Sequence, residues 1–299
     1  MTVTAPPAAA AAERRLPRPT GRPRWLSHSG LIIGGAIVAA VFVMAVFAPL
    51  IAPYDPYHQD LLARLTPPVW KAAGDWTHPL GTDHLGRDYL SRLIYGARIS
   101  LTIGVGTAIV SGIIGTALGV CAGYFGGKVD SVIMFVVTAR LAMPVILVAL
   151  AVVALLGASL SVVMLTLGLL LWDRFALVMR GSTQQLRSAE FVTAAQLQGA
   201  TVFQIFRHEI LPNLINNLLV VATLEMALAI VLEAALSFLG LGVPAPLPSW
   251  GLMISEGKAS ILFEPWLITI PGVALFLLVL GTNLMGDGLR DVTAPQGRN

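Results

Sequence analysis

Six runs of roughly twenty apolar residues divide this chain, at about residues 31–52, 99–123, 131–155, 160–179, 214–236 and 265–284. Each run is long enough to cross a hydrocarbon core of roughly 30 Å as a helix. Of the 299 residues, 56% are hydrophobic and 12% are charged, whereas soluble domains have about 25% charged residues. The sequence therefore excludes an ordinary soluble enzyme and predicts an all-α polytopic membrane protein with six transmembrane helices.

The flanks of these runs predict how the chain is oriented. Residues 1–29 are rich in Ala, Pro and Arg and lack apolar periodicity, so we expect a disordered cytoplasmic tail. The run within 30–52 is too long for a signal peptide and has no cleavage site after it, so it predicts a retained first span. Basic residues favour the cytoplasmic side. We therefore expect both termini inside, with a cytoplasmic tail at 288–299 and an extracytoplasmic cap segment at 53–98.

Residues 188–212 predict a pair of short helices between the fourth and fifth spans. Ser188 can cap the first helix, Glu190 lies in its first turn, and Gly199 is placed to end it. Thr201 has the residue spacing that caps a second helix together with a glutamine three positions later. From the pattern alone, the pair forms either a compact unit on the cytoplasmic face or an amphipathic loop on the lipid surface.

Two proline residues are placed where they should end or bend a helix. Pro212 follows Ile210 and Leu211 and is expected to stop the second short helix. Pro144 lies inside the third span, where it frees a backbone carbonyl and permits a kink, as in helices that line cavities.

Small residues recur every fourth position along one face of the second span, at Ser111, Gly115, Gly119 and Gly123. A tandem small-xxx-small pattern lets helix backbones approach closely. We interpret this stripe as a helix-packing face, against the alternative of chance in a glycine-rich helix.

Ionisable residues inside a bilayer are costly and usually face a partner or water. Arg140 and Glu225 have opposite charges at similar depth, so we expect them to pair directly or to face a shared aqueous cavity on the translocation pathway. A buried ion pair that only fixes packing is the alternative. Asp173 and Arg174 are interpreted as structural, because an arginine there can extend toward the interface. Glu233, nearer the outer end, would meet passing solute or reach water.

Motifs for catalysis and for metal or nucleotide binding are missing. Neither Gly127-Lys128 nor Gly257-Lys258 completes a P-loop, and no pattern of a zinc protease or a serine hydrolase occurs. The single cysteine, Cys121, excludes an intrachain disulfide and a cysteine-based metal site. We expect no cofactor and no metal on this chain. The charge pattern reflects topology, which argues against nucleic-acid binding.

The segment EFVTAAQLQGATVFQIFRHEILPN at 190–213 resembles the EAA loop of binding-protein-dependent ABC importer permeases. Thr193 stands where that family has Glu. The resemblance implies a role in coupling to the ATPase for Glu190, Thr193, Ala194, Ala195, Gly199, Ala200, Ile210 and Pro212.

Three further stretches resemble the C-type permease subunit of dipeptide, oligopeptide and nickel importers: HPLGTDHLGRDYLSRLIYGARISL at 78–101, SFLGLGVPAPLPSWG at 237–251 and NLMGDGLRD at 283–291. The resemblance extends over about residues 31–291 and implies a five-helix permease core at 99–287. Thr138 and Arg140 depart from it, since Asp and an aliphatic residue are expected there, so a solute other than a generic peptide stays open.

The resemblance implies a non-catalytic subunit of the bacterial cytoplasmic (inner) membrane that forms half of a translocation pathway for peptides or a related solute. Its implied partners are a homologous permease subunit, two ATPase subunits that carry ATP and Mg²⁺, an extracytoplasmic solute-binding protein, and membrane lipid. The cap would dock that binding protein or act as a simple lid. Two alternatives are an ion-coupled secondary transporter, which would usually show internal repeats, and a membrane-embedded hydrolase, which would need a nucleophile or metal set.

Overall fold

The computed structural model describes residues 28–293, and within them all regular elements are helical apart from an isolated bridge between Thr82 and Asp88. The tail expected at 1–29 lies outside the described residues except for its last two positions. Residues 294–299 of the expected C-terminal tail also lie outside them.

Five helices of the described chain are long and apolar enough to cross a membrane, and a bent helix pair raises the number to six. The straight candidates are α1 (Ser29–Val46), α3 (Tyr89–Phe125), α6 (Leu160–Leu170) with α7 (Asp173–Arg187), α10 (Leu211–Phe238) and α12 (Trp266–Thr293). The bent pair is α4 (Gly127–Leu141) with α5 (Val145–Leu156). These helices lie at the six predicted apolar runs, five of them as straight candidate spans and the third run as the bent pair.

The bend between α4 and α5 is 82° and coincides with Pro144. Proline lacks a backbone N–H and disfavours helical geometry in the residue before it. Pro144 accordingly takes an extended conformation and begins α5 as its N-cap. The expected kink is therefore a full break in the third span.

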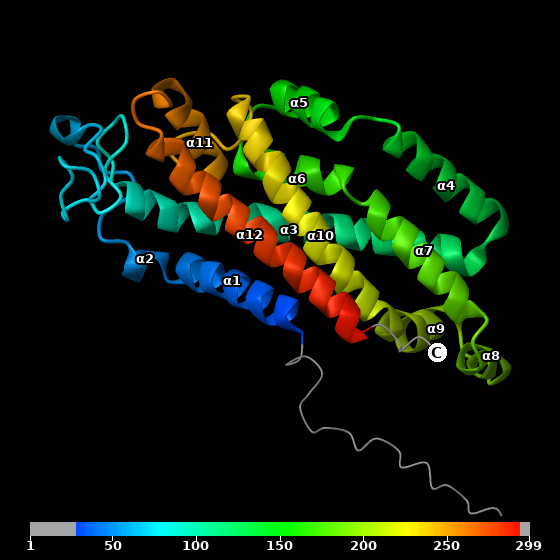
Figure 1. Cartoon of the computed structure of the whole chain (residues 1–299). Helices are drawn as coiled ribbons and strands as arrows, with labels where there is room; N and C mark the ends of the chain where they lie inside the picture. Colours follow the sequence, from blue (N-terminus) through cyan, green and yellow to red (C-terminus); the bar gives the residue numbers. More distant parts are fainter. Residues whose placement is uncertain (1–27, 294–299) are drawn as a thin grey trace, which may run out of the picture.

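The remaining short elements gather at the two ends of the helix bundle (Figure 1). The cap loops lie at one end together with α2 (Ala48–Ile51), a 3-10 turn (Leu61–Ala63), α11 (Trp250–Gly257) and a second 3-10 turn (Lys258–Ser260). The other end carries α8 (Glu190–Leu197) and α9 (Val202–Ile205). Gly288 of α12 packs against Leu31 of α1, so the described chain begins and ends on the same side of the bundle.

Two expected boundaries differ from the observed ones. Helix α3 begins at Tyr89, so the last ten residues of the segment expected as cap, 53–98, belong to a span. Asp88 caps this helix by accepting a hydrogen bond from the Ser91 amide at 2.8 Å. Helix α12 continues to Thr293, so the segment expected as a tail from residue 288 starts within the last span.

Apolar side chains fill the contacts between spans and also cover their outer faces. One core cluster joins α1, α3, α10, α11 and α12 around the fully buried Trp250. Outward-facing groups such as Leu155 and Phe135 are 85% and 75% exposed. An apolar outer surface of this kind is expected where lipid, rather than water, surrounds the helices.

Candidate functional site

The coupling segment begins with α8, whose C-terminus has the hydrogen bonds of a Schellman motif. The amide of Ala200 donates to the Ala195 carbonyl and the amide of Gly199 donates to the Gln196 carbonyl, both at 3.0 Å. Gly199 has φ +79°, a conformation that suits glycine. The predicted cap is wrong at the other end: Ala189 is the N-cap, and the Ser188 hydroxyl donates to the Gln185 carbonyl instead.

Helix α9 starts with the expected capping box. The Thr201 hydroxyl accepts from the Gln204 amide, and the Gln204 side chain accepts from the Thr201 amide at 2.8 Å. The predicted stop at Pro212 is wrong. Helix α9 passes through a π-helical turn (Phe206–Ile210) directly into α10, and Pro212 lies two residues after that turn, inside the continuous helical stretch.

A polar cavity of about 450 Å³ lies between α8 and α9. It is lined by Ala195, Gln198, Gly199, Ala200, Gln204, Ile205, His208 and Glu209. Glu190, Thr193 and Ala194 are exposed on α8, whereas Ile210 is buried beneath the segment. Of the coupling residues suggested by sequence, Ala195, Gly199 and Ala200 line this cavity.

Two exposed apolar side chains on this surface escaped the sequence analysis. Leu197 on α8 is 85% exposed and Phe203 on α9 is 70% exposed. They lie at the end of the bundle, beside polar groups, where an exposed apolar patch is typical of a protein contact. Their positions two residues before Gly199 and two residues after Thr201 could have suggested them.

Four charged side chains meet inside the apolar layer where α4, α7 and α10 converge. Arg140 Nη1 donates to Asp173 Oδ2 at 3.1 Å, and Arg174 Nη1 lies 3.4 Å from Glu225 Oε1. The expected direct Arg140–Glu225 pair is therefore replaced by two pairs with adjacent residues of α7. Along α7, Arg174 lies six residues, about 9 Å, from Arg180, which pairs with Asp130 at the polar end of the span.

The hydrogen bonding of this charged cluster is incomplete. Both carboxylate oxygens of Glu225, and Nε and Nη2 of Arg140, are buried without a hydrogen-bond partner. The Arg174 side chain is 60% exposed, whereas that of Glu225 is fully buried. A guanidinium at this depth is costly against lipid, so this face of α7 is suited to water or to a polar partner.

Glu233 differs from its expected setting because it is fully buried and contacts no solvent. One of its oxygens accepts hydrogen bonds from Ser237 at 2.8 Å and from Ser249 at 2.9 Å. Ser249 caps α11, so Glu233 fixes the start of α11 against α10. The alternatives of meeting solute or reaching water are therefore wrong for this arrangement.

The small-residue stripe of α3 packs on the backbone of α7. A Cβ added at Gly119 would come 2.5 Å from the Ala176 carbonyl oxygen, and one at Gly123 would come 2.6 Å from that of Arg180. Gly115 faces the Trp172 carbonyl in the same way, and Ser111 is buried one turn before it. Only glycine leaves room for this approach.

The outer end contains a buried charge network that the sequence did not reveal. Asp83 binds Arg87 at 2.7 Å and also accepts a hydrogen bond from Arg92. The two arginines reach Glu256 of α11 at 3.1 and 2.7 Å. Burial raises the pKa of Asp83, but Arg92, Arg87 and two backbone amides outweigh this effect, so the pKa lies below its usual value. The network joins the cap, α3 and α11.

A second contact, at 2.8 Å, joins Lys71 of the cap to Glu264, just before α12. The Lys71 hydrogen bond is the main cause that lowers the pKa of Glu264. Among the described residues, no group of three His, Cys, Asp or Glu side chains is placed to hold a metal ion. At the outer end, ion pairs therefore hold the cap loops against the helices.

Known proteins match this chain over nearly its whole length. Residues 115–296 match the family of binding-protein-dependent transport system inner membrane components, and residues 22–68 match the N-terminal transmembrane domain of oligopeptide transport permease C. The di/tripeptide transport system permease protein DppC of Pseudomonas aeruginosa is 40% identical over 92% of both chains. The dipeptide transport system permease protein DppC of Haemophilus influenzae is 38% identical over 90% of this chain and 91% of its own.

Other matches are more distant. The glutathione transport system permease protein GsiD of Pectobacterium atrosepticum is 36% identical over 91% of this chain and 89% of its own. A chain from the MetNI methionine ABC transporter, solved in inward-facing conformations, is 19% identical with a TM-score of 0.55. It covers 68% of this chain and 97% of its own length. This last likeness shows a shared fold.

Proposed function

Because this chain belongs to the family of binding-protein-dependent transport system inner membrane components, we propose that it forms half of the translocation pathway of an ATP-driven importer of short peptides. It is a multi-pass protein of the inner membrane. The peptide assignment is supported by relatives that are named for dipeptide, di/tripeptide and oligopeptide transport. The chain itself carries no catalytic role in this proposal.

The assembly in this proposal has parts on both sides of the membrane. A homologous permease subunit completes the pathway, two ATPase subunits hold ATP and Mg²⁺ on the cytoplasmic side, and a solute-binding protein docks on the cap. Both termini and the helices α8 and α9 face the cytoplasm. The exposed Leu197 and Phe203, with the cavity around Gly199, are suited to contact an ATPase subunit.

Movement at the ATPase can reach the membrane through one continuous element. Residues Val202–Phe238 form an uninterrupted helical stretch from α9 through the π-turn to the outer end of α10. Glu225 lies on this stretch, about 35 Å from its start at Val202 when 1.5 Å is allowed per residue. A push on α9 therefore tilts the segment that carries Glu225. ATP and the docked binding protein must each prefer one state for this tilt to switch access.

The observation that carries the pathway assignment is the Arg174–Glu225 pair. A guanidinium that is 60% exposed within the apolar layer, 3.4 Å from a fully buried carboxylate, favours an aqueous surface over a lipid-facing one. The incomplete hydrogen bonding of Glu225 and Arg140 also favours an aqueous surface here, because water or a rearranged partner can satisfy these atoms. We therefore assign the surface of α4, α7 and α10 around Arg174 to the pathway.

The test is uptake of a radiolabelled dipeptide into proteoliposomes that contain the complete complex. We expect uptake only with ATP on the cytoplasmic side, both ATPase subunits intact and the binding protein on the opposite side. A complex with a catalytically dead ATPase serves as the control. Uptake by this chain alone, driven by an ion gradient, would refute the proposal and favour the secondary transporter.

A further inference from the structure

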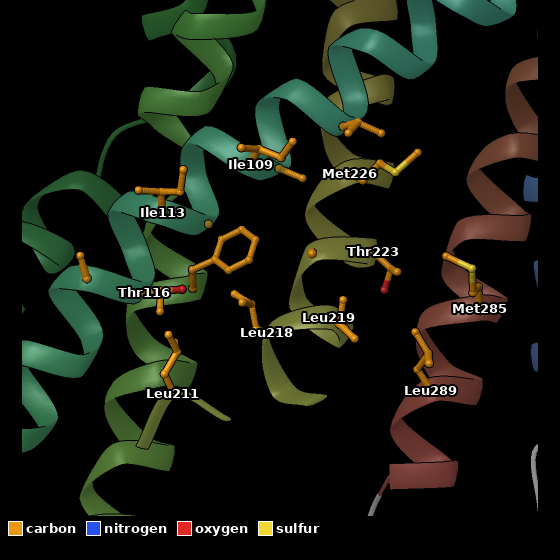
Figure 2. A pocket seen from close by; sticks show the side chains of 16 residues that line it. Ile109, Ile113, Thr116, Leu211, Leu218, Leu219, Thr223, Met226, Met285 and Leu289 are labelled. Atoms are coloured by element: carbon orange, nitrogen blue, oxygen red, sulfur yellow. The ribbon is translucent and has the colours of Figure 1, made fainter. Parts of the chain in front are cut away.

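An apolar groove of about 680 Å³ opens between α3, α10 and α12. Figure 2 shows side chains from these helices pointing into it, among them Ile109, Ile113, Leu218, Met226 and Met285. Its volume lies within the range of roughly 300 to 1,000 Å³ that is typical of ligand pockets. None of the four residues of the charged cluster lines the groove, so it is separate from the proposed pathway.

A second cavity of about 470 Å³ adjoins the groove and leads toward the coupling helices. The two cavities share Thr116, Ala117 and Leu211. The second one extends to Cys121 and to Arg207, which is the one charged side chain in either lining. Arg207 is exposed. The combined cavity is therefore apolar along its length and cationic at one end.

The combined cavity is long enough to hold the tail of a lipid from one leaflet. Along α3 it extends from Val105 to Cys121, sixteen residues apart or about 24 Å. A single leaflet contributes about 15 Å of hydrocarbon, half of the core thickness. Gly123 packs at the level of Arg180, where α7 meets Asp130, so the cationic end lies at the polar end of the spans.

We propose that an anionic phospholipid binds here, with an acyl chain in the groove and its phosphate on Arg207. A guanidinium matches phosphate geometry and charge. A peptide would leave its backbone groups unpaired, because the lining offers few polar atoms besides the hydroxyls of Thr116 and Thr223. Thr223 already donates to the Val220 carbonyl at 2.8 Å.

Charge complementarity at the end of the groove selects the lipid class. The residues that follow Arg207 in sequence, His208 and Glu209, line the separate polar cavity between α8 and α9. Neither of them lines the lipid site, so the charge at that site is the positive charge of Arg207. Helix α10 forms one wall from Leu211 to Met226. The bound lipid therefore supports the helix that transmits movement from the coupling segment.

The test uses the complete transporter in phosphatidylcholine nanodiscs that contain a small amount of phosphatidylglycerol with a photoactivatable diazirine in its acyl chain. We expect labelling at Ile113 and Leu218 to exceed labelling of Ile33, an exposed side chain of α1. The variant Arg207→Gln should reduce groove labelling by phosphatidylglycerol about fivefold and leave labelling by a phosphatidylcholine analogue unchanged. The matched variant Lys128→Gln removes another exposed basic group and should have no effect.

A second variant tests the tail independently of the headgroup. Ala117→Phe fills the junction of the two cavities and should reduce labelling by both lipids, whereas Ala39→Phe on the exposed face of α1 should not. Equal labelling of the groove and Ile33, or unchanged labelling in Arg207→Gln, would overturn the proposal. Cross-links from the groove to the second permease subunit in place of lipid would also overturn it and identify a subunit interface. If a variant fails to assemble, the wild-type transporter is labelled in the presence of excess unlabelled phosphatidylglycerol or phosphatidylcholine. Stronger competition by phosphatidylglycerol supports the proposal, and equal competition by the two lipids contradicts it.

Discussion

Arg92 Nη1 of α3 lies 2.7 Å from Glu256 Oε2 of α11, although the two residues are 164 positions apart. The Arg92 side chain is fully buried and that of Glu256 is 17% exposed. This pair closes the outer end of the bundle, because the same arginine also holds Asp83 of the cap. The cap and α11 are thus both tied to α3.

Replacing Arg92 by Met should loosen the outer end. The change leaves Asp83 and Glu256 buried without one of their cations, and such losses cost about 3 to 5 kcal/mol. We expect a lower midpoint temperature of thermal unfolding for the purified complex, and faster proteolysis of the cap. The control is Arg98→Met, an exposed arginine two turns further along α3. An equal effect of both changes would contradict the role of the network.

Acid should release the cap from the bundle. The pKa of Asp83 is lower in the folded protein than its usual value, so its stabilising effect is fully present above the unfolded pKa of about 3.9 and is lost as the pH falls through the lower folded pKa. We expect the cap to resist pepsin down to about pH 4 and to become sensitive below it. In the variant Asp83→Asn, pepsin should cleave the cap already at about pH 4, where the wild-type cap still resists. A wild-type-like acid profile for this variant would disprove the assignment.

The local features of this fold were predictable, because they depend on residues close in sequence. Apolar runs predicted the six spans, and the Thr201 capping box and the Gly199 helix end followed from short motifs. The partner of Arg140 was not predictable, since depth alone does not say which of several helices stands beside it. The buried network of Asp83 and Arg92 was missed for the same reason. The start of α3 at Tyr89 was missed because its first residues are polar and do not belong to an apolar run.

The glycine stripe makes a quantitative prediction. Gly119→Ala would bring a Cβ within 2.5 Å of the Ala176 carbonyl oxygen, so α3 and α7 must separate at a cost of about 1 to 3 kcal/mol. The matched change Gly181→Ala on α7 has open space around it and should be neutral or slightly stabilising. Midpoint temperatures of the two purified complexes compare them, and an unchanged value for Gly119→Ala would mean that the stripe tolerates separation.

Gly199 should matter for coupling through its backbone conformation. A Cβ there meets open space, but φ +79° strains any other residue, at a cost of about 1 to 2 kcal/mol. We expect Gly199→Ala to lower dipeptide uptake per ATP hydrolysed. Gly240→Ala is a matched control, because Gly240 has φ +83° and open space at the opposite end of α10. A similar uncoupling in both variants would show that strain alone, and not its position, is responsible.

Arg174 and Glu225 should respond unequally to loss of charge. Removing the cation in Arg174→Gln leaves a fully buried carboxylate unpaired, whereas Glu225→Gln leaves an arginine that is 60% exposed and can be solvated. A buried carboxylate without its cation is the costlier loss, so Arg174→Gln should lower the midpoint temperature of unfolding more than Glu225→Gln. If this face lines the pathway, both changes also lower uptake while basal ATP hydrolysis persists. Leu169→Gln, at an exposed position of α6, controls for the insertion of a polar group. Normal uptake by both charge variants would mean that the pair only fixes packing.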